Sequence, residues 1–356
     1  MPTNAQVAVL RAGSDVLSVE DVELPDPTQN QVLVRNLGAG VCHSQLHEIR
    51  AQRDRTYFLG HEACGIVESV GPDAHFVVPG DAVSVSWVPR PGIGTPWRAG
   101  AALEDGEYAS TDEMIYTWST HSLIDQRYVV RIPHEVARDA AAVLGCAVLT
   151  GASAVVRTAK VPAGASVVVW GAGGVGLSAI AAARHAKAGH VIAVDVSPEK
   201  LALAMDFGAT HAVDAAQTDP VAALFEITAR VDGPPGADYV FDCVAQQSTL
   251  DTALAAVRRG VLGTSRGGQL VVVGVPAPGV GVSARELLIG QKTATASLGV
   301  PEDTGREIPL LAQWCMNGDI DLDALVTDRY ELHDINRAIS DLAGGRVRGR
   351  AILTFP

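Results

Sequence analysis

A glycine-rich turn between an apolar strand and an alanine-rich helix constrains the fold of this chain more than any other feature. Residues 166–170 (SVVVW) form an uninterrupted apolar run, residues 171–176 (GAGGVG) follow, and residues 177–188 are helical in composition. The same alternation of apolar strands and helices continues further along the chain, at 191–194, 198–207, 239–241 and 270–273. Strands that alternate with helices predict a doubly wound parallel sheet, and so an α/β fold.

The turn itself has the spacing G-x-G-x-x-G. Gly171 permits the tight turn, Gly173 lets the backbone approach a pyrophosphate, and Gly176 lets the helix pack on the strand. The free N–H groups at the helix N-terminus favour phosphate. Asp195 ends the next strand, where a carboxylate accepts hydrogen bonds from ribose hydroxyls and repels a 2′-phosphate, which favours NAD over NADP. The alternative is a glycine turn in a sheet that binds no dinucleotide.

The first 135 residues have a different texture. Short apolar or alternating runs are separated by turn signals such as Pro-Asp-Pro, Gly-Pro-Asp and Pro-Gly-Asp. This pattern predicts a β-rich, barrel-like domain with strands at 7–10, 32–34, 65–70 and 82–85. Residues 88–112 hold most of the helix and strand breakers of this region and are expected to form one long loop, with Pro89, Pro91, Pro96 and packing around Trp97 giving its shape.

Charge and composition exclude several classes of function. The 356 residues contain 40 acidic and 27 basic side chains, a net charge of −13, which argues against nucleic-acid binding through a basic surface and against attraction to an anionic membrane. We expect a cytoplasmic protein, since the N-terminus lacks a secretory signal and the five cysteines suggest a reducing compartment. The uncharged stretch 165–183 is better explained by strand, turn and helix than by a membrane span.

Three metal-ligating side chains lie far apart in the sequence. Cys42, His61 and Cys146 would supply two thiolates and one imidazole, which suits zinc with a fourth tetrahedral position open to water or an alcohol. Zinc there would lower the pKa of an alcohol and polarise a carbonyl. Scattered Cys and His are also commonly packing or surface residues, and spacing alone does not decide between the two.

With these residues in view, the chain resembles the medium-chain dehydrogenase/reductase family, in its zinc-dependent alcohol dehydrogenase branch. The resemblance covers nearly the whole chain. The segments that carry it occur in family order: GVCHSQLH, GHEACGIVESVG, PGDAV, GCAVLTG, VVVWGAGGVG, VIAVDVSPEKL, VVVGVP and RAILTF. It implies a GroES-like catalytic domain and a Rossmann cofactor domain, with the active site where the two domains meet.

The resemblance also implies roles for individual residues. Cys42, His61 and Cys146 match the catalytic zinc ligands, and Glu62 matches an acid that approaches the metal. Ser44 matches the hydroxyl that takes the alcohol proton, and His47 the histidine that passes it toward solvent; a solvent-exposed His47 without a catalytic role is the alternative. Residues that match contacts to the cofactor are His43, Gly171, Gly173, Gly174, Val175, Gly176, Asp195, Lys200, Val273, Val275 and Arg350.

Three assignments have a plain alternative. Trp87 and Trp118 fall where the family places bulky residues of the substrate pocket, but both could be ordinary core residues. Arg350 could be a surface cation near the C-terminus.

The chain departs from the family at two places. Gln45 stands where relatives commonly have an aspartate that hydrogen-bonds the histidine ligand, so the metal site would be less negative. No cysteine falls between residues 65 and 145, so a four-thiolate structural zinc site cannot form there, and we expect one zinc ion per chain.

The sequence therefore predicts an NAD-dependent zinc alcohol dehydrogenase. Its catalytic domain would comprise residues 1–147 and 299–356, with a cofactor domain at 148–298, and it would form a homodimer or homotetramer. Its substrates would be primary, secondary or aryl alcohols and the matching carbonyls. The alternatives are a biosynthetic reductase of an activated alkene or aldehyde in the same family, and a binding module without turnover.

Arg50, Arg53 and Arg55 either favour an acidic substrate or form an exposed basic face.

Overall fold

The chain divides into two compact units. The computed structural model describes residues 2–51, 53–92, 97–112, 114–229, 233–299 and 303–356. The first unit comprises Met1–Cys146 and Glu302–Pro356, and the second comprises Ala147–Pro301. The first is β-rich and the second is a parallel α/β sheet, which confirms the expected fold class.

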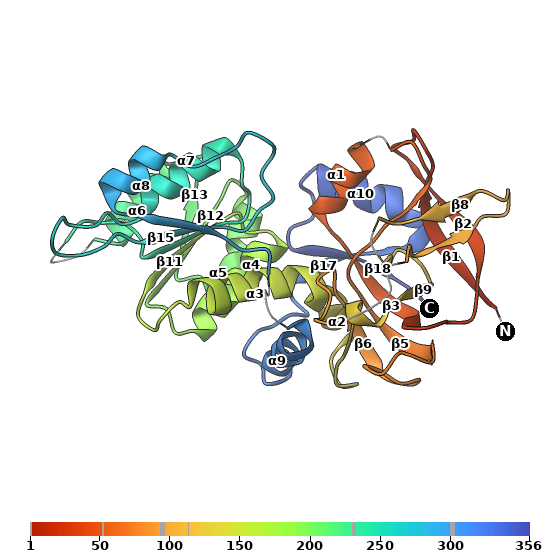
Figure 1. The fold of residues 1–356 in the computed structure, drawn as a ribbon. Helices are drawn as coiled ribbons and strands as arrows, with labels where there is room; N and C mark the ends of the chain where they lie inside the picture. Colours follow the sequence, from red (N-terminus) through yellow and green to blue (C-terminus); the bar gives the residue numbers. More distant parts are fainter. Residues whose placement is uncertain (1, 52, 93–96, 113, 230–232, 300–302) are drawn as a thin grey trace. The chain divides into compact units, whose positions relative to one another are not determined.

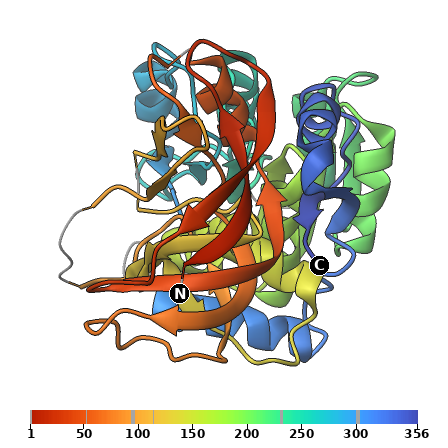
Figure 2. The same ribbon diagram turned by 90° about the vertical axis from the view of Figure 1, so that its right-hand side faces the viewer.

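The first unit contains two mostly antiparallel sheets. One has the strand order β2-β1-β4-β8-β7, and the other has the order β10-β6-β5-β3-β18-β17, with β9 also paired to β3 (Figures 1 and 2). The strands are β1 (Thr3–Leu10), β2 (Leu17–Leu24), β3 (Gln31–Val41), β4 (Tyr57–Phe58), β5 (Ala63–Val70), β6 (Ala82–Val85), β7 (Gly100–Ala102), β8 (Tyr108–Ser110), β9 (His121–Asp125), β10 (Val129–Arg131), β17 (Val326–Glu331) and β18 (Arg350–Thr354). Its helices are α1 (His43–Arg50), α2 (Arg138–Val143), α9 (Thr304–Met316) and α10 (Ile335–Ala343).

Strand β3 organises this unit. It pairs antiparallel with β5 on one side and with β18, from the far end of the chain, on the other. Alternating apolar residues of these strands, such as Val32, Val34 and Leu353, are buried in a common core. The strand ends at Val41, and α1 begins directly after Cys42, so the first part of the metal-ligand set stands at the end of a well-buried strand.

The expectation of one long loop over residues 88–112 was wrong. Strands β7 and β8 form a short antiparallel hairpin within it, and β8 pairs in parallel with β4. Small residues explain the error: Gly100, Ala101 and Ala109 carry little strand signal but are buried in the first sheet's core, against which Trp97 packs. Pro96 lies outside the described residues.

The second unit is a doubly wound parallel sheet. Its strand order is β13-β12-β11-β14-β15-β16, and all the pairings are parallel. In Figure 1, α4 and α5 lie on one face of this sheet and α7 and α8 on the other. The elements are α3 (Leu149–Ser153), β11 (Ser166–Trp170), α4 (Gly174–His185), β12 (His190–Asp195), α5 (Pro198–Asp206), β13 (His211–Asp214), α6 (Pro220–Ile227), β14 (Tyr239–Asp242), α7 (Gln247–Ala256), β15 (Gln269–Val272), α8 (Ala284–Gly290) and β16 (Thr293–Ala296).

The strand order of this sheet reverses beside β11. The chain runs from β11 outward to β13 and then returns to β14 on the other side of β11. The glycine turn follows β11 at this position. Ligands of open α/β sheets bind at the carboxyl ends of the strands at such a reversal.

One helical stretch among the described residues is long and apolar enough to raise the question of a membrane span. It covers Arg138–Ala159, has a mean hydropathy of 1.8 over its most apolar window, and has 89% of that window buried inside the protein. The stretch 165–183 is instead the strand β11, the glycine turn and most of α4.

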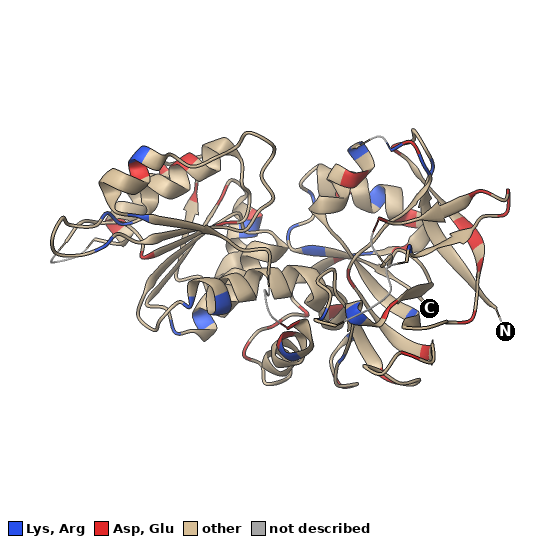
Figure 3. Ribbon diagram, in the orientation of Figure 1, with Lys and Arg blue, Asp and Glu red and all other residues tan. Residues whose placement is uncertain are grey.

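The charged residues of both units are dispersed. Lys and Arg are scattered among Asp and Glu along the ribbon in Figure 3.

Candidate metal and cofactor sites

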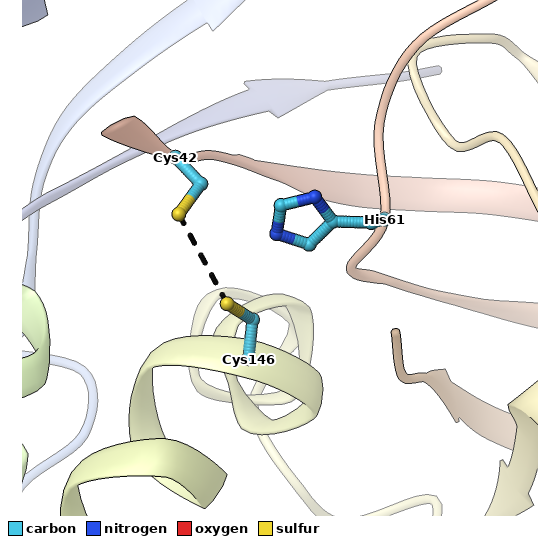
Figure 4. A group of neighbouring side chains, drawn as sticks. All are labelled: Cys42, His61 and Cys146. Carbon is cyan, nitrogen blue, oxygen red and sulfur yellow. Dashed lines mark hydrogen bonds between the residues drawn. The ribbon is translucent and has the colours of Figure 1, made fainter. Parts of the chain in front are cut away.

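Cys42, His61 and Cys146 meet in the first unit. One potential ligand atom from each of them lies within 4.8 Å of the others. The two sulfur atoms are 4.0 Å apart and face each other, and the His61 ring points into the same space (Figure 4). Both cysteines are buried, and His61 is half-buried. The three residues proposed as zinc ligands from the sequence are therefore neighbours in the folded chain, although they are far apart along it.

A different element of local structure positions each proposed ligand. Cys42 is the N-cap residue of α1. His61 follows Gly60, whose φ of +99° turns the chain between β4 and β5 and whose missing Cβ leaves room for Trp118 and Thr117. Cys146 lies in a π-helical turn, Leu144–Val148, which packs closely on the end of β6: a Cβ on Gly145 would lie 2.0 Å from the carbonyl oxygen of Val85.

The electrostatics of the cluster favour one thiolate before any metal binds. The pKa of Cys42 lies well below its ordinary value because the Cys146 thiol donates to it and because Arg350 and His61 are nearby, which together outweigh burial. The pKa of Cys146 is raised by the same hydrogen bond and by burial. Burial alone would lower the pKa of His61, but its hydrogen bond with Cys42 and the charge of Cys42 outweigh burial and raise it.

The donor set fits zinc. Two sulfur ligands of tetrahedral zinc, at about 2.3 Å each, lie about 3.8 Å apart, and the observed separation of 4.0 Å is close to this value. The residues supply three ligands, which leaves a fourth position, the arrangement of a catalytic rather than a structural site.

A buried ion pair stands beside the cluster. The Arg350 guanidinium donates to Glu62 Oε1, and both side chains are almost fully buried. Burial raises the pKa of Glu62, while Arg350 opposes the shift. The Glu62 carboxylate occupies space that exists only because residue 40 is glycine, since a Cβ there would lie 2.1 Å from Glu62 Oε1.

The burial of Arg350 corrects one alternative considered above. Arg350 is 5% exposed and is therefore not a surface cation. It begins β18, and its charge also acts on Cys42 and Cys146. Its hydrogen bond and ion pair join it to Glu62, whereas its role as a phosphate contact stays a prediction.

The predicted proton-relay residues lie on α1. Ser44 is half-buried, and its hydroxyl oxygen is inaccessible to water and has no hydrogen-bond partner among the described residues. His47 is exposed one helical turn later, and His43 is exposed at the start of the helix. Residues three or four apart lie on the same side of a helix, so Ser44 and His47 share one side of α1.

The glycine turn of the second unit has the geometry expected of a phosphate site. Gly171 has φ of +87°, and a Cβ on Gly176 would lie 1.8 Å from the Gly171 carbonyl oxygen, so neither position tolerates a side chain without a backbone shift. A Cβ on Gly173 would meet nothing within 4 Å. This open side of the turn is where a ligand can approach the backbone, at the N-terminus of α4.

Asp195 also stabilises this turn. Its Oδ2 accepts from the N–H of Ala172 at 2.7 Å, and its Oδ1 accepts from the N–H groups of Val196 and Ser197. It therefore joins the turn after β11 to the turn after β12. An ionised carboxylate accepts about four hydrogen bonds, so acceptor capacity remains for a ribose.

Five more of the predicted cofactor residues, Gly174, Val175, Lys200, Val273 and Val275, lie on the same unit, whereas His43 and Arg350 belong to the first. Gly174 and Val175 begin α4, and Lys200 is half-buried in the first turn of α5. Val273 is buried after β15, and Val275 is 65% exposed.

The two tryptophans differ. Trp118 is fully buried in the core of the first unit, and its indole N–H donates to the carbonyl oxygen of Gly40 at 3.0 Å. These contacts support the core-packing alternative for Trp118. Trp87 is only partly buried, and its indole nitrogen is shielded from water without a hydrogen-bond partner among the described residues. Trp87 directly follows Ser86, whose hydroxyl donates to the carbonyl of Gly145, next to Cys146.

Comparisons with known proteins agree with this architecture. Residues 28–134 match the family model of the alcohol dehydrogenase GroES-like domain, and residues 174–313 match that of zinc-binding dehydrogenases. The chain is 31% identical to an S-(hydroxymethyl)glutathione dehydrogenase of Aspergillus oryzae over 96% of this chain and 93% of the relative. It is 30% identical to the Haemophilus influenzae protein of that name, over 96% and 95% of the two chains.

Solved structures show the same likeness. An alcohol dehydrogenase zinc-binding domain protein from Burkholderia ambifaria matches with a TM-score of 0.87 and 28% identity, covering both chains completely. Benzyl alcohol dehydrogenase from Acinetobacter calcoaceticus matches with a TM-score of 0.85 and 26% identity, over 99% of this chain and 100% of that one.

The fold and the site together define a zinc-type dehydrogenase. The chain belongs to the medium-chain dehydrogenase/reductase family, in its zinc-dependent alcohol dehydrogenase branch. It is an oxidoreductase that acts on CH–OH groups with zinc and NAD as cofactors.

Proposed function

We propose that this enzyme oxidises small alcohols, primary, secondary or aryl, to the corresponding carbonyl compounds with NAD, and that Cys42, His61 and Cys146 hold the catalytic zinc. The observation that carries the proposal is the convergence of these three ligand atoms within 4.8 Å, from three separate segments of one unit. Zinc bound there supplies a Lewis acid that lowers the pKa of an alcohol, and NAD accepts the hydride. Glu62 is the acid that stands beside the ligands, balanced by Arg350.

Proton removal falls to Ser44 and His47. The Ser44 hydroxyl is shielded from water and has no hydrogen-bond partner within the described ranges, so it is available to accept a proton from an alcohol and to donate its own onward. His47, exposed on the same side of α1, exchanges the proton with solvent.

Most of the proposed cofactor contacts belong to the second unit. The glycine turn and the N-terminus of α4 hold the pyrophosphate, and Asp195 binds the adenosine ribose and selects NAD. The remaining cofactor contacts that we propose are His43, Gly174, Val175, Lys200, Val273, Val275 and Arg350.

The substrate class follows from the partly buried Trp87 and from the relatives. Relatives of this chain are named for S-(hydroxymethyl)glutathione and benzyl alcohol, compounds that each carry a CH2OH group. We propose that Trp87 lines the substrate site, supported by its position two residues beyond β6 and next to Ser86, which contacts the Cys146 turn. Trp87→Ala should therefore favour bulky alcohols over small ones.

The test is a spectrophotometric assay. Purified enzyme with NAD and a panel of primary, secondary and aryl alcohols should produce NADH, with activity lost on zinc removal and restored by zinc. A protein that oxidises no alcohol and reduces no aldehyde in the panel would contradict the proposal. Reduction of an activated alkene without alcohol oxidation would favour the reductase alternative, against which the complete ligand set and the Ser44–His47 pair count.

Assembly and location complete the proposal. We propose a cytoplasmic homodimer or homotetramer whose catalytic domain comprises 1–147 and 299–356 and whose cofactor domain comprises 148–298. Strand β16 supports self-association because it is an edge strand of the parallel sheet and carries no charged side chain. The exposed apolar side chains of Leu288, Ile289 and Leu298 flank it in the sequence. Light scattering coupled to size-exclusion chromatography measures the oligomeric state, and a monomer would contradict this part.

A further inference from the structure

Gln45 has an unusual environment for a glutamine in the first turn of a helix. It is the third residue of α1 and only 1% exposed. Its Oε1 accepts a hydrogen bond from the backbone N–H of Cys42 at 3.2 Å. Its Nε2 is shielded from water and has no hydrogen-bond partner among the described residues.

The contact is one half of a capping box. Gln45 closes onto the backbone of the N-cap residue, and the Cys42 side chain in return faces the backbone N–H of Gln45. In most capping boxes the N-cap residue is Ser or Thr, and the arrangement serves only to stabilise the N-terminal end of the helix. Here the N-cap residue is a cysteine whose sulfur belongs to the metal-ligand cluster. Residue 45 therefore holds the Cys42 backbone at both its N–H and its carbonyl, and its own N–H faces the Cys42 sulfur.

Charge also matters at this position. Two thiolates neutralise a divalent cation, and Glu62 is already balanced by Arg350. A carboxylate at position 45 would add an uncompensated negative charge to a buried site, whereas an amide provides the same acceptor oxygen without it. The buried Nε2 of Gln45 has no partner in the described part of the chain, so the contact with the Cys42 backbone carries the argument for this side chain.

We propose that Gln45 is a positioning residue of the zinc site, which fixes the Cys42 ligand through the capping box and keeps the site electrically neutral. The inference rests on the proposed ligand set. It predicts that substitutions at residue 45 change metal affinity through two separable effects: loss of the acceptor oxygen loosens Cys42, and added negative charge strengthens attraction for the cation.

The test compares zinc affinity in competition with a chromophoric chelator. Gln45→Leu removes the acceptor and should weaken zinc binding about tenfold or more, the effect typical of residues that orient a metal ligand. Gln45→Glu keeps an acceptor oxygen and adds charge, so it should bind zinc at least as tightly as the wild type. Cobalt substitution gives a second readout, because the sulfur-to-cobalt absorption band should change in Gln45→Leu and persist in Gln45→Glu.

Gln126 provides a matched control. It is also a buried glutamine of the first unit, and its Oε1 accepts from the backbone N–H groups of His75 and Phe76. Gln126→Leu should lower thermal stability while its zinc affinity stays within twofold of the wild type.

Each outcome decides the inference. Unchanged zinc affinity in Gln45→Leu, or an equal loss in Gln126→Leu, would overturn it and leave the proposed ligand set standing. If Gln45→Leu does not fold, Gln45→Glu decides, since weaker zinc binding in that folded variant would refute both effects. A wild-type protein that binds neither zinc nor cobalt would instead refute the ligand set, and the inference with it.

Discussion

The Glu62–Arg350 pair offers a sharp test of how the buried site is held together. Glu62→Gln conserves the volume but removes the charge that faces Arg350, whose side chain is 6% exposed. A buried charge left without its partner costs about 3–5 kcal/mol. We expect about 3 kcal/mol, the low end of that range, because the amide oxygen can still accept one hydrogen bond and the charge of Cys42 also acts on Arg350. For a unit of this size the melting temperature should fall by about 6–12 °C.

The assay is thermal and urea unfolding of metal-free protein, followed by circular dichroism. Asp334→Asn is the matched control, because it breaks an exposed ion pair with Arg337 and should cost less than about 1 kcal/mol. The double variant Glu62→Leu with Arg350→Met should recover most of the loss, because it removes both charges together. A Glu62→Gln variant no less stable than Asp334→Asn would refute the reasoning.

Four further predictions concern cofactor, proton relay, thiols and metal. Asp195→Ser should narrow the preference for NAD, and a wild-type kcat/KM for NADP equal to that for NAD would contradict the ribose assignment. Ser44→Ala should lower kcat by roughly two orders of magnitude, and His47→Gln by less since water can replace it; a slower His47 variant at every pH would reverse the roles. Burial raises the pKa of Cys64 to about 12, so its thiolate fraction at pH 8 is about 10⁻⁴ and its reaction with a thiol reagent should quicken about tenfold per pH unit; rapid labelling of Cys64 in the folded protein at pH 8 would contradict this. Elemental analysis should find about one zinc per chain, and Cys42→Ser should lose it while keeping the fold; two tightly held ions, or an unfolded variant, would count against a single catalytic site.

Sequence reasoning located the elements whose signal is local. Strand β11, the glycine turn and β6 were predicted at or near their observed limits, because β-branched runs and glycine spacing are properties of neighbouring residues. Helix α4 begins at Gly174 rather than Leu177, since glycines of the turn take part in its first turn. The hairpin of β7 and β8 was missed because its alanines and glycine enter a strand only through the packing of the sheet around them.

The candidate site likewise combines residues that local sequence patterns indicate with contacts that only tertiary packing creates. Ligand chemistry and the family resemblance could nominate Cys42, His61 and Cys146, but only the fold brings them together. No pattern in the sequence indicated that Arg350 would be buried against Glu62, because that pair joins residues separated by 288 positions. Gly40 carried a signal that was not used: a glycine inside an apolar strand often marks a place where another group comes close, here the Glu62 carboxylate.

The position of β18 has a consequence for how the protein is made. This strand, the last in the chain, lies between β17 and β3 in the sheet, and it carries Arg350. During synthesis the second unit, a single continuous stretch, leaves the ribosome whole before β18 exists. Until then, β3 keeps an open edge from Gly38 to Val41, directly ahead of Cys42. Nascent chains should therefore pass through a state with one folded unit and one unfinished barrel, exposed to edge-to-edge aggregation, and loss of β18 should be far more damaging than its five residues suggest.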